Sequence, residues 1–355
     1  MVVTVTYGNR KHLLEQLVHE LLTQEVSKII IVNNGASWEV KAWAQTLSPK
    51  IVVISLHQNT GSAGGFAIGI SKAMELKAEM IWLLDDDNKP LKNTLTKLLT
   101  AYHELSQVHP QEPLMVLGLR ASRDLDLIIS QLHPIQERPS SFLGFHVFDI
   151  PKKIGNKFFK FLKPRVSSTH SKLPDKIHIQ EAPYGGILFH RNLIQTIGLP
   201  RADFVLYCDD LEFTYRVTQH HGSIYIITDA LIEDLEPASN EIKYYPMWNW
   251  IRHLPPEKSF RTYYHLRNKI YFNTYCKMSK ISWMYHINRY TYLGLLWIVA
   301  IFNHRSQQYA LLAQAISDGV HRHLGVGPEF QGVAFEVAQI DISEHKNKDD
   351  IPMAN

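Results

Sequence analysis

Residues 80–88 read MIWLLDDDN, an apolar run that ends in three consecutive carboxylates, Asp85, Asp86 and Asp87. Such a run is typical of a buried strand. Adjacent carboxylates repel one another unless positive charge lies beside them, and a divalent metal ion is one source of that charge. An acidic turn that caps the next helix is the alternative, because Asp and Asn are common in turns and at helix N-termini. The stretch alone leaves both interpretations open.

The segments around this strand predict an α/β fold. Expected strands span residues 2–7, 28–32, 51–55 and 114–119, and expected helices span residues 11–24, 38–46, 66–76 and 91–106. Alternating strands and helices are typical of a doubly wound, mostly parallel sheet, which binds ligands beyond the carboxyl ends of its strands. Tyr7, Asn33, the glycine-rich turn at 59–65 and the three aspartates all fall at those ends.

The composition fits a folded protein with a large core. Of 355 residues, 45% are hydrophobic and 20% are charged, and the net charge of +3 is too small to imply nucleic acid. Two cysteines cannot make a disulfide framework, so a reducing compartment is expected. The amino-terminal residues lack a basic leader followed by an apolar region, which predicts no secretory signal and a cytoplasmic location.

A second acidic cluster, Asp209, Asp210 and Glu212, follows another apolar run at 204–208 and opens an expected helix. Both clusters are expected at the same rim of the sheet. The first could hold a metal ion and a diphosphate, because hard cations prefer oxygen ligands. The second could supply a general base, since removing a hydroxyl proton needs a positioned carboxylate. N-capping of the helix is the alternative for Asp209 and Asp210, and a cap can also be catalytic.

The remaining segments are less regular. The basic insertion at about 150–178 predicts either a solvated face or contact with a phosphate-bearing or lipid-linked acceptor or an anionic membrane. Long helices rich in Tyr, Trp and His are expected beyond about 240. Residues 292–302 (YLGLLWIVAIF) are too short to span a bilayer and suit a buried helix or one at a membrane surface. The polar tail from 331 has no clear period.

Six motifs in order resemble family 2 glycosyltransferases, most closely the bacterial rhamnosyl- and galactofuranosyltransferases. They are Thr6-Tyr7, Val32-Asn33-Asn34-Gly35, Asn59-x-Gly61-x-Ala63-Gly64-Gly65-Phe66, Leu84-Asp85-Asp86-Asp87, Gly185-Gly186 and Asp209-Asp210-Leu211-Glu212-Phe213. Tyr263-Tyr264-x-x-Arg267-Asn268 and Ala315-Ile316-x-Asp318-Gly319 add to the likeness, which covers roughly residues 2–326.

The resemblance implies a GT-A fold with three parts: a catalytic domain over 1–238, a helical region over 239–330 and a tail over 331–355. It implies an inverting transfer from a nucleotide sugar with Mn²⁺ or Mg²⁺. The residues that would bind the donor nucleotide and sugar are Thr6, Tyr7, Asn33, Asn34, Asn59, Gly64, Gly65, Asp85 and Asp86. Asp85 and Asp87 would bracket the metal ion, and Asp210 would be the catalytic base with Glu212 orienting acceptor hydroxyls or the local backbone. Tyr184, Gly185, Gly186 and Asp209 would meet the acceptor.

The chain departs from the family pattern at two places. Asn33 replaces the usual acid after the second strand, and Asp234 stands where some galactofuranosyltransferases have a metal-binding histidine. Either Asp234 is the third ligand, which would give an all-oxygen shell and is the favoured alternative, or the metal shell lacks a third side chain.

The favoured donor is UDP-galactofuranose, with dTDP-rhamnose as the alternative. The acceptor would be a glycan or lipid-linked oligosaccharide of bacterial surface polysaccharide, O-antigen or capsule. No nucleic-acid partner is expected, peripheral contact with the inner membrane is an open alternative, and the oligomeric state, a homo-oligomer included, is undetermined. A nucleotide-binding oxidoreductase fits poorly, because the glycine-rich turn follows the third strand and lacks GxGxxG spacing. A non-catalytic glycan-binding protein would have no need for a base beside a metal site.

Overall fold

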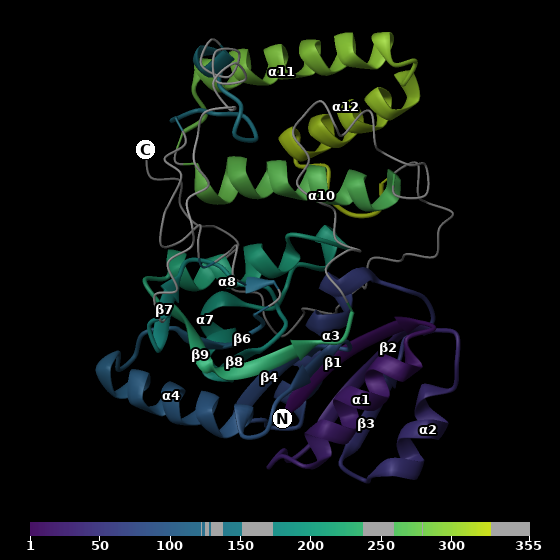
Figure 1. The fold of residues 1–355 in the computed structure, drawn as a ribbon, viewed down its shortest axis with the longest axis vertical. Helices are drawn as coiled ribbons and strands as arrows, with labels where there is room; N and C mark the ends of the chain where they lie inside the picture. Colours follow the sequence, from purple (N-terminus) through teal and green to yellow (C-terminus); the bar gives the residue numbers. More distant parts are fainter. Residues whose placement is uncertain are drawn as a thin grey trace, which may run out of the picture.

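The computed structural model describes residues 1–121, 123, 124, 128, 138–150, 173–236, 259–278 and 280–327 (Figure 1). Most of the expected basic insertion, residues 151–172, and the expected tail from 331 lie outside this range.

The amino-terminal third is the expected alternation of parallel strands and helices. Its elements are β1 (Val2–Gly8), α1 (Lys11–Leu22), β2 (Ile29–Ala36), α2 (Val40–Leu47), β3 (Ile51–Ser55), α3 (Gly61–Glu75) and β4 (Met80–Asp85). β1 lies between β2 and β4 and runs parallel to both, and β3 runs parallel to β2. Because these strands are parallel, their carboxyl ends form one edge, and that edge carries Thr6, Asn33 and Asp85.

The second half of the sheet is mixed. Its elements are β5 (Asn88–Pro90), α4 (Thr94–Val108), β6 (Leu114–Leu119), β7 (Lys176–Ile179), β8 (Ile187–His190), α7 (Asn192–Ile197), α8 (Asp209–Gln219) and β9 (Ser223–Asp234). The strand order is β3-β2-β1-β4-β8-β6-β9-β5, with β7 beside β9. Strands β1, β2, β3, β4, β6 and β9 run in one direction, and β5, β7 and β8 oppose them. The expected α/β fold with a mostly parallel sheet is therefore confirmed.

Strand periodicity gives the sheet two apolar faces. Val3, Val5 and Ile81 face a core that α3, α7 and α8 cover, whereas Val2 and Trp82 face a core that α1, α2 and α4 cover. Successive strand residues alternate between the two cores because side chains on a strand point to opposite faces.

Helix α3 begins at Gly61 and not at the expected Phe66. The reason lies in close packing, since a Cβ at Gly65 would come 2.6 Å from Val5 Cγ1 and one at Gly69 would come 2.3 Å from Val3 Cγ1. These glycines let the helix lie directly on β1, so the glycine-rich segment forms the helix and not a long turn. Ser223–Asp234 form one long strand, β9, whose pairing with β6 shifts register after Gly118.

The carboxyl-terminal described region is helical, as expected. It contains α10 (Ser259–Tyr271), a π-helical segment (Phe272–Lys277), α11 (Trp283–Phe302) and α12 (Ser306–Val320). α10 lies between the sheet part and α11 (Figure 1). Buried side chains of α10, α11 and α12 share one apolar core with Phe142 and Phe145. None of the described helices is both long enough and apolar enough to cross a bilayer.

Candidate functional site

The three aspartates of the opening motif lie where β4 turns into β5. Asn88 organises this turn: its Oδ1 accepts from the Asp85 backbone N–H at 3.1 Å, and its Nδ2 donates to Asp87 Oδ1 at 3.2 Å. The same Nδ2 donates to Asp234 Oδ1 at 3.1 Å, because β5 pairs antiparallel with β9 and sets Asn88 opposite Asp234. The structure thus brings Asp234 to the aspartate triplet.

Three arginines, which sequence reasoning missed, surround this cluster. Arg10 Nε lies 2.9 Å from Asp86 Oδ1, and Arg10 Nη2 lies 3.5 Å from Asp87 Oδ2. Arg123 Nη2 lies 3.4 Å from Asp87 Oδ2, and Arg123 Nε lies 3.2 Å from Asp234 Oδ2. The position of Arg10, two residues beyond β1 and just before α1, is the one sequence signal that could have identified it.

The third arginine, Arg120, follows β6 and is buried. Its Nη2 pairs with Asp124 Oδ1 at 2.9 Å, and its Nη1 lies 3.8 Å from Asp85 Oδ2. Among described residues, the ion pairs of the three arginines with this cluster involve six carboxylates, those of Asp85, Asp86, Asp87, Asp124, Asp234 and Glu236. When all six are ionised, these described carboxylates carry three more negative charges than the three guanidinium groups carry positive ones.

The pKa values of the triplet reflect this excess. Burial, together with the charge of Asp87, raises the pKa of Asp85 to about 7, while Arg120 opposes the shift. Burial raises the pKa of Asp86 to about 6 against the attraction of Arg10. Burial also raises the pKa of Asp87, against Arg123 and Arg10. Added positive charge would therefore be favourable here, because it stabilises the ionised forms.

The cluster has the donor chemistry of a hard divalent cation but not its coordination geometry. Its oxygens and excess negative charge suit Mg²⁺ or Mn²⁺. Within the described part of the chain, however, no three His, Cys, Asp or Glu side chains are arranged to hold a metal ion. Asp87 and Asp234 share Arg123 and Asn88 instead.

The second acidic cluster opens α8. Asp209 is buried and both its carboxylate oxygens accept from Ser62 Oγ, at 3.1 and 3.0 Å. Asp210 is half-buried, and its Oδ1 accepts from the Leu211 backbone N–H at 2.8 Å. Glu212 accepts two bonds from Arg216, at 3.0 and 2.6 Å, and Arg216 in turn donates to the carbonyl of Ile197. Glu212 therefore fixes α8 to α7.

Asp209 and Asp210 have raised pKa values, and no arginine of the described residues forms an ion pair with either of them. Burial and the neighbouring charge of Asp210 raise the pKa of Asp209 well above its usual range. Burial raises the pKa of Asp210 to about 6, while the Leu211 N–H and the charge of Arg120 oppose the shift. The positive charge of Arg120 thus opposes the rise in pKa of both Asp85 and Asp210, one carboxyl group from each cluster.

Gly185 lies beside the same guanidinium. A Cβ there would come 2.2 Å from Asn88 Oδ1, 2.7 Å from Asp85 Oδ2 and 2.8 Å from Arg120 Nη1. Gly186 has φ +103°, and its carbonyl accepts from Trp82 Nε1 at 3.3 Å. The expected acceptor residue Tyr184 is buried, with its ring 4.3 Å from that of Phe66. Only a residue without a side chain fits at Gly185.

The residues expected to bind the nucleotide gather at the ends of β1, β2 and β3. Thr6 is buried and lies opposite Asn33, while Tyr7 is 39% exposed with the Arg10 guanidinium 5.2 Å from its ring centre. Asn33 Oδ1 accepts from the Ala36 backbone N–H at 2.8 Å. Tyr7 therefore presents an accessible ring at this edge.

Asn34 and Asn59 form a network that shapes the start of α3. Asn34 Nδ2 donates to Asn59 Oδ1 at 3.1 Å and to the Gly61 carbonyl at 2.9 Å, and its Oδ1 accepts from the Thr60 N–H at 2.7 Å. Gly64 and Gly65, also expected at the donor, are buried in α3, and Gly65 packs on Val5. Asn34 and Gly65 thus serve the packing of this edge.

The loop before α8 has an unusual backbone. Three non-glycine residues have positive φ: Val205 at 65°, Tyr207 at 67° and Cys208 at 59°. Such conformations are strained and persist only where neighbours hold them. Asn268 of α10 supplies the support, because its Nδ2 donates to the carbonyls of three loop residues, Phe204 at 2.8 Å, Leu206 at 2.9 Å and Tyr207 at 2.9 Å.

The loop also meets α3. The Ala63 N–H donates to the Val205 carbonyl at 3.3 Å, and a Cβ on Gly61 would come 1.8 Å from that oxygen. The buried Arg267 donates to the Phe204 carbonyl at 3.1 Å. The loop that precedes Asp209 and Asp210 is therefore held between α3 and the carboxyl-terminal helices.

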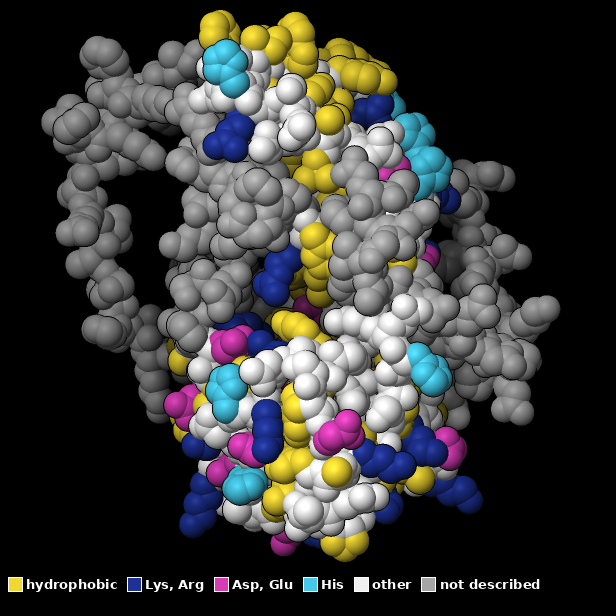
Figure 2. Space-filling model, turned by 90° about the vertical axis from the view of Figure 1, so that its right-hand side faces the viewer, with side chains coloured by type: hydrophobic (Ala, Val, Ile, Leu, Met, Phe, Trp, Pro, Cys, Tyr) yellow, Lys and Arg dark blue, Asp and Glu magenta, His cyan; other side chains and the backbone are white. Residues whose placement is uncertain are grey.

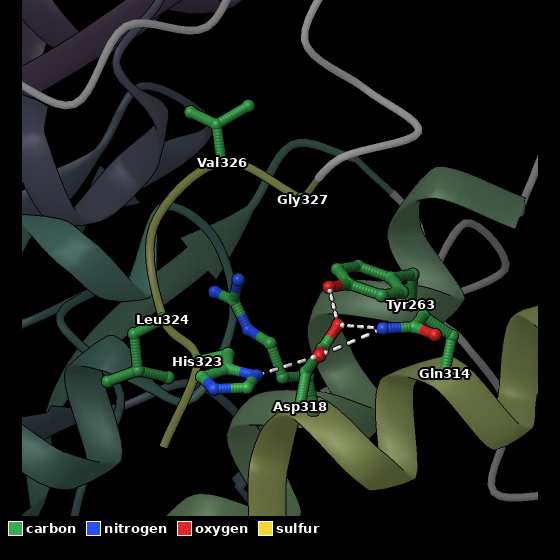
Figure 3. A pocket seen from close by; sticks show the side chains of 8 residues that line it. Tyr263, Gln314, Asp318, His323, Leu324, Val326 and Gly327 are labelled. Atoms are coloured by element: carbon green, nitrogen blue, oxygen red, sulfur yellow. Dashed lines mark hydrogen bonds and ion pairs between the residues drawn. The ribbon is translucent and has the colours of Figure 1, made fainter. Parts of the chain in front are cut away.

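A separate cavity of about 330 Å³ lies in the helical region (Figure 3). It is lined by Tyr263, Arg267, Gln314, Asp318, His323, Leu324, Val326 and Gly327. Asp318 accepts from Tyr263 Oη at 2.6 Å and from Gln314 Nε2 at 2.9 Å, and its Oδ1 lies 3.4 Å from His323 Nδ1. These bonds join α10 to α12, so Asp318 and Tyr263 connect helices and lie apart from the acidic clusters.

Comparisons with known proteins agree with the likeness in the motifs. Residues 1–111 match Glycosyl transferase family 2. Galactofuranosyltransferase GlfT1 of Mycolicibacterium smegmatis is 31% identical over 113 residues, which are 30% of this chain and 37% of that protein. The match therefore spans little more than a third of the relative.

Two solved structures resemble the chain. One is GalNAc-T7 with UDP, GalNAc and Mn²⁺, at a TM-score of 0.46 and 12% identity over 81% of this chain and 53% of that one, and the other is S. aureus TarS 1-349. The TarS structure has a TM-score of 0.42 and 12% identity over 91% of this chain and 90% of its own.

Proposed function

We propose, from the match of residues 1–111 to glycosyl transferase family 2, that the whole chain is an inverting, metal-dependent glycosyltransferase. One observation carries the proposal. Arg120 Nη1 lies 3.8 Å from Asp85 Oδ2, and its positive charge also opposes the rise in the pKa of Asp210. The group that binds the diphosphate and the general base would therefore share the influence of one guanidinium. Gly185, whose lack of a side chain lets its backbone pack directly against Arg120 and Asp85, supports the same assignment.

The nucleotide would bind at the ends of β1 to β3. Tyr7 would stack on the base, and Asn33 would hydrogen-bond its edge. Asn34 and Asn59 would act by fixing the start of α3. Asp86, which Arg10 holds, would lie near the ribose or the donor sugar.

Asp85, Asp87 and Asp234, which β5 and β9 bring to Asp87, carry the oxygens that would hold Mn²⁺ or Mg²⁺. In the structure these carboxylates pair with Arg120, Arg123 and Asn88, so metal binding would require these contacts to rearrange. When bound, the ion would neutralise charge on the leaving diphosphate. Arg120 would add a fixed positive charge beside Asp85, where negative charge develops as the diphosphate departs.

Asp210 would accept the proton of the acceptor hydroxyl. The hydroxyl oxygen then forms a bond to the anomeric carbon as the bond from that carbon to the diphosphate oxygen breaks, and the electron pair leaves with the nucleoside diphosphate. Attack opposite the leaving group inverts the anomeric configuration. Asp209, Gly185 and Gly186 would border the acceptor, while Glu212 and Tyr184 position α8 and the neighbouring loop.

The favoured donor is UDP-galactofuranose, because the relative with 31% identity is named a galactofuranosyltransferase. dTDP-rhamnose is the alternative donor. The acceptor would be a glycan or lipid-linked oligosaccharide of bacterial surface polysaccharide, such as O-antigen or capsule, assembled on the cytoplasmic side of the inner membrane.

A thermal-shift panel of UDP, dTDP and GDP with Mn²⁺ tests the donor class, because a ligand that binds only the folded state raises its melting temperature. UDP alone is expected to stabilise the chain. Stabilisation by dTDP alone would select the rhamnosyl alternative, and no response to any nucleotide would contradict donor binding.

A further inference from the structure

Helix α11 has one buried side and one exposed apolar side. Its buried residues include Tyr285, Asn288, Tyr292, Leu296 and Ala300, which face α12 and the loop around Phe142. Its exposed apolar side chains are Trp283, Ile287, Tyr290, Trp297, Ile298, Ile301 and Phe302, among them Phe302 at 81% and Trp283 at 70% exposure. The sequence left open whether this helix is buried or lies at a surface, and each description fits one side of it.

The exposed residues form a continuous stripe, which we call the α11 face. The stripe follows helical spacing through Trp283, Ile287, Tyr290, Trp297 and Ile301. Gly294 occupies the turn between Tyr290 and Trp297, and no atom lies within 4 Å of the place where its Cβ would be. Seven of the fourteen exposed large hydrophobic side chains of the described residues lie on this one helix. Figure 2 shows apolar side chains gathered at the top of the molecule, where Figure 1 places α11. Isolated exposed hydrophobic residues are ordinary, but a stripe of this kind marks an interaction site.

The surroundings of the α11 face are basic. Over residues 280–327 there are four Lys or Arg and one acid, Asp318, so these residues carry net +3. Asp318 is buried and bonded to Tyr263 and Gln314, so it offers no exposed negative charge. Lys280 precedes the helix, and His304 and Arg305 follow it. Positive charge therefore flanks the apolar stripe at both ends.

We propose that the α11 face binds the surface of an anionic bilayer, with the helix lying in the plane of the interface. Trp and Tyr are favoured at the level of the lipid head groups, and long basic side chains reach the head-group charges from the ends of such a helix. A second copy of the chain is a poorer occupant. Pairing two α11 faces would bring the basic residues Lys280 and Arg305 of both copies together, and residues 280–327 contain no exposed acid to balance them.

Vesicle co-sedimentation of the full chain tests this proposal. The chain is expected to sediment with vesicles of phosphatidylglycerol and phosphatidylcholine at low salt, and to bind at least tenfold less to phosphatidylcholine alone or at high salt. The double variant Trp297→Glu/Ile301→Glu is expected to lose at least tenfold in binding. Both side chains are exposed, so circular dichroism and thermal unfolding should match the unsubstituted chain.

Val108→Glu is the matched control, because Val108 is a 71% exposed apolar residue on α4, away from α11 in Figure 1. It should bind anionic vesicles like the unsubstituted chain. The proposal is overturned if the chain does not bind anionic vesicles, or if the double variant binds them equally, which would point to another segment. It is also overturned if the double variant instead dissolves a dimer seen by analytical ultracentrifugation, because the occupant would then be a second copy.

Discussion

The two acidic clusters differ in how their charge is balanced. Asp85, Asp86 and Asp87 each lie within 4 Å of an arginine nitrogen. Asp209 and Asp210 instead accept from a serine hydroxyl and a backbone N–H, and no ion pair joins either of them to another described residue. Burial raises the pKa values of the carboxyl groups in both clusters, but among the described residues only the first cluster has arginines paired with its carboxylates.

This difference suggests a division of work. A cluster of fixed, partly compensated charges suits a metal ion and a diphosphate, whose charges change little on binding. A carboxylate with a pKa near the working pH and without a bound counter-charge suits proton transfer. The predictions below separate the two roles.

The largest effect is expected from Asp210→Asn. Loss of a general base should lower kcat by about 10³-fold, because an amide cannot take the hydroxyl proton. Steady-state transfer assays would measure this. Asp229→Asn is the control, since Asp229 is an exposed acid on β9 that pairs only with Lys97 among the described ion pairs, and its transfer rate should be unchanged. Near-normal turnover by Asp210→Asn would remove the second cluster from the chemistry.

Removal of divalent ions should come next. Excess EDTA is expected to lower turnover by about 10²-fold or more, because the ion offsets charge on the leaving diphosphate. Added Mn²⁺ or Mg²⁺ should restore the rate. Full turnover in EDTA would contradict the metal role of the first cluster.

The pH profile should show the raised pKa of Asp210. The free enzyme needs this carboxylate ionised, so kcat/KM should be level above pH 7 and fall as the pH drops through about 6. For one titrating base, the loss at pH 5 is about tenfold. A profile level down to pH 4.5 would show that the group is not raised, or not the base.

A smaller effect is expected at Asn268, which supports the loop that aims the second cluster. Asn268→Ala leaves three loop carbonyls without this donor and should lower the free energy of unfolding by about 2 kcal/mol. It should also lower kcat by about fivefold with KM for the donor unchanged, because the base is less well positioned.

Asn303→Ala is the matched control, since Asn303 Nδ2 donates only to the Val299 carbonyl at the end of α11. It should leave kcat unchanged. A purely structural role for Asn268 would be indicated by lost stability with an unchanged kcat at a temperature where both proteins are folded.

Sequence periodicity was sufficient for most of the fold. Alternating apolar residues and helical spacing located the strands and helices of the first third, and the strand at 114–119 agrees with β6. It could not reveal β5, which has three residues and no period of its own. That strand is also what brings Asp234 to Asp87, so the approach of these two carboxylates rests on pairing between distant segments.

The sequence predicted the acidic residues of the candidate site but did not reveal its arginines. Consecutive aspartates are conspicuous in a sequence, whereas Arg10, Arg120 and Arg123 each stand among ordinary loop and helix residues. Their importance comes from the ends of β1 and β6 converging on the acidic turn. Gly65 shows the reverse case, because motif position pointed to the ligand while the structure shows Val5 as its neighbour. Glu212, expected to orient acceptor hydroxyls or the local backbone, accepts from Arg216.

The most direct test compares nucleotide affinity in two variants by isothermal titration calorimetry with UDP and Mn²⁺. Division of work between the clusters predicts that Asp210→Asn binds UDP within about twofold of the unsubstituted chain, while Asp87→Asn binds at least about tenfold more weakly. Equal loss of affinity in both variants, or loss only in Asp210→Asn, would contradict the account.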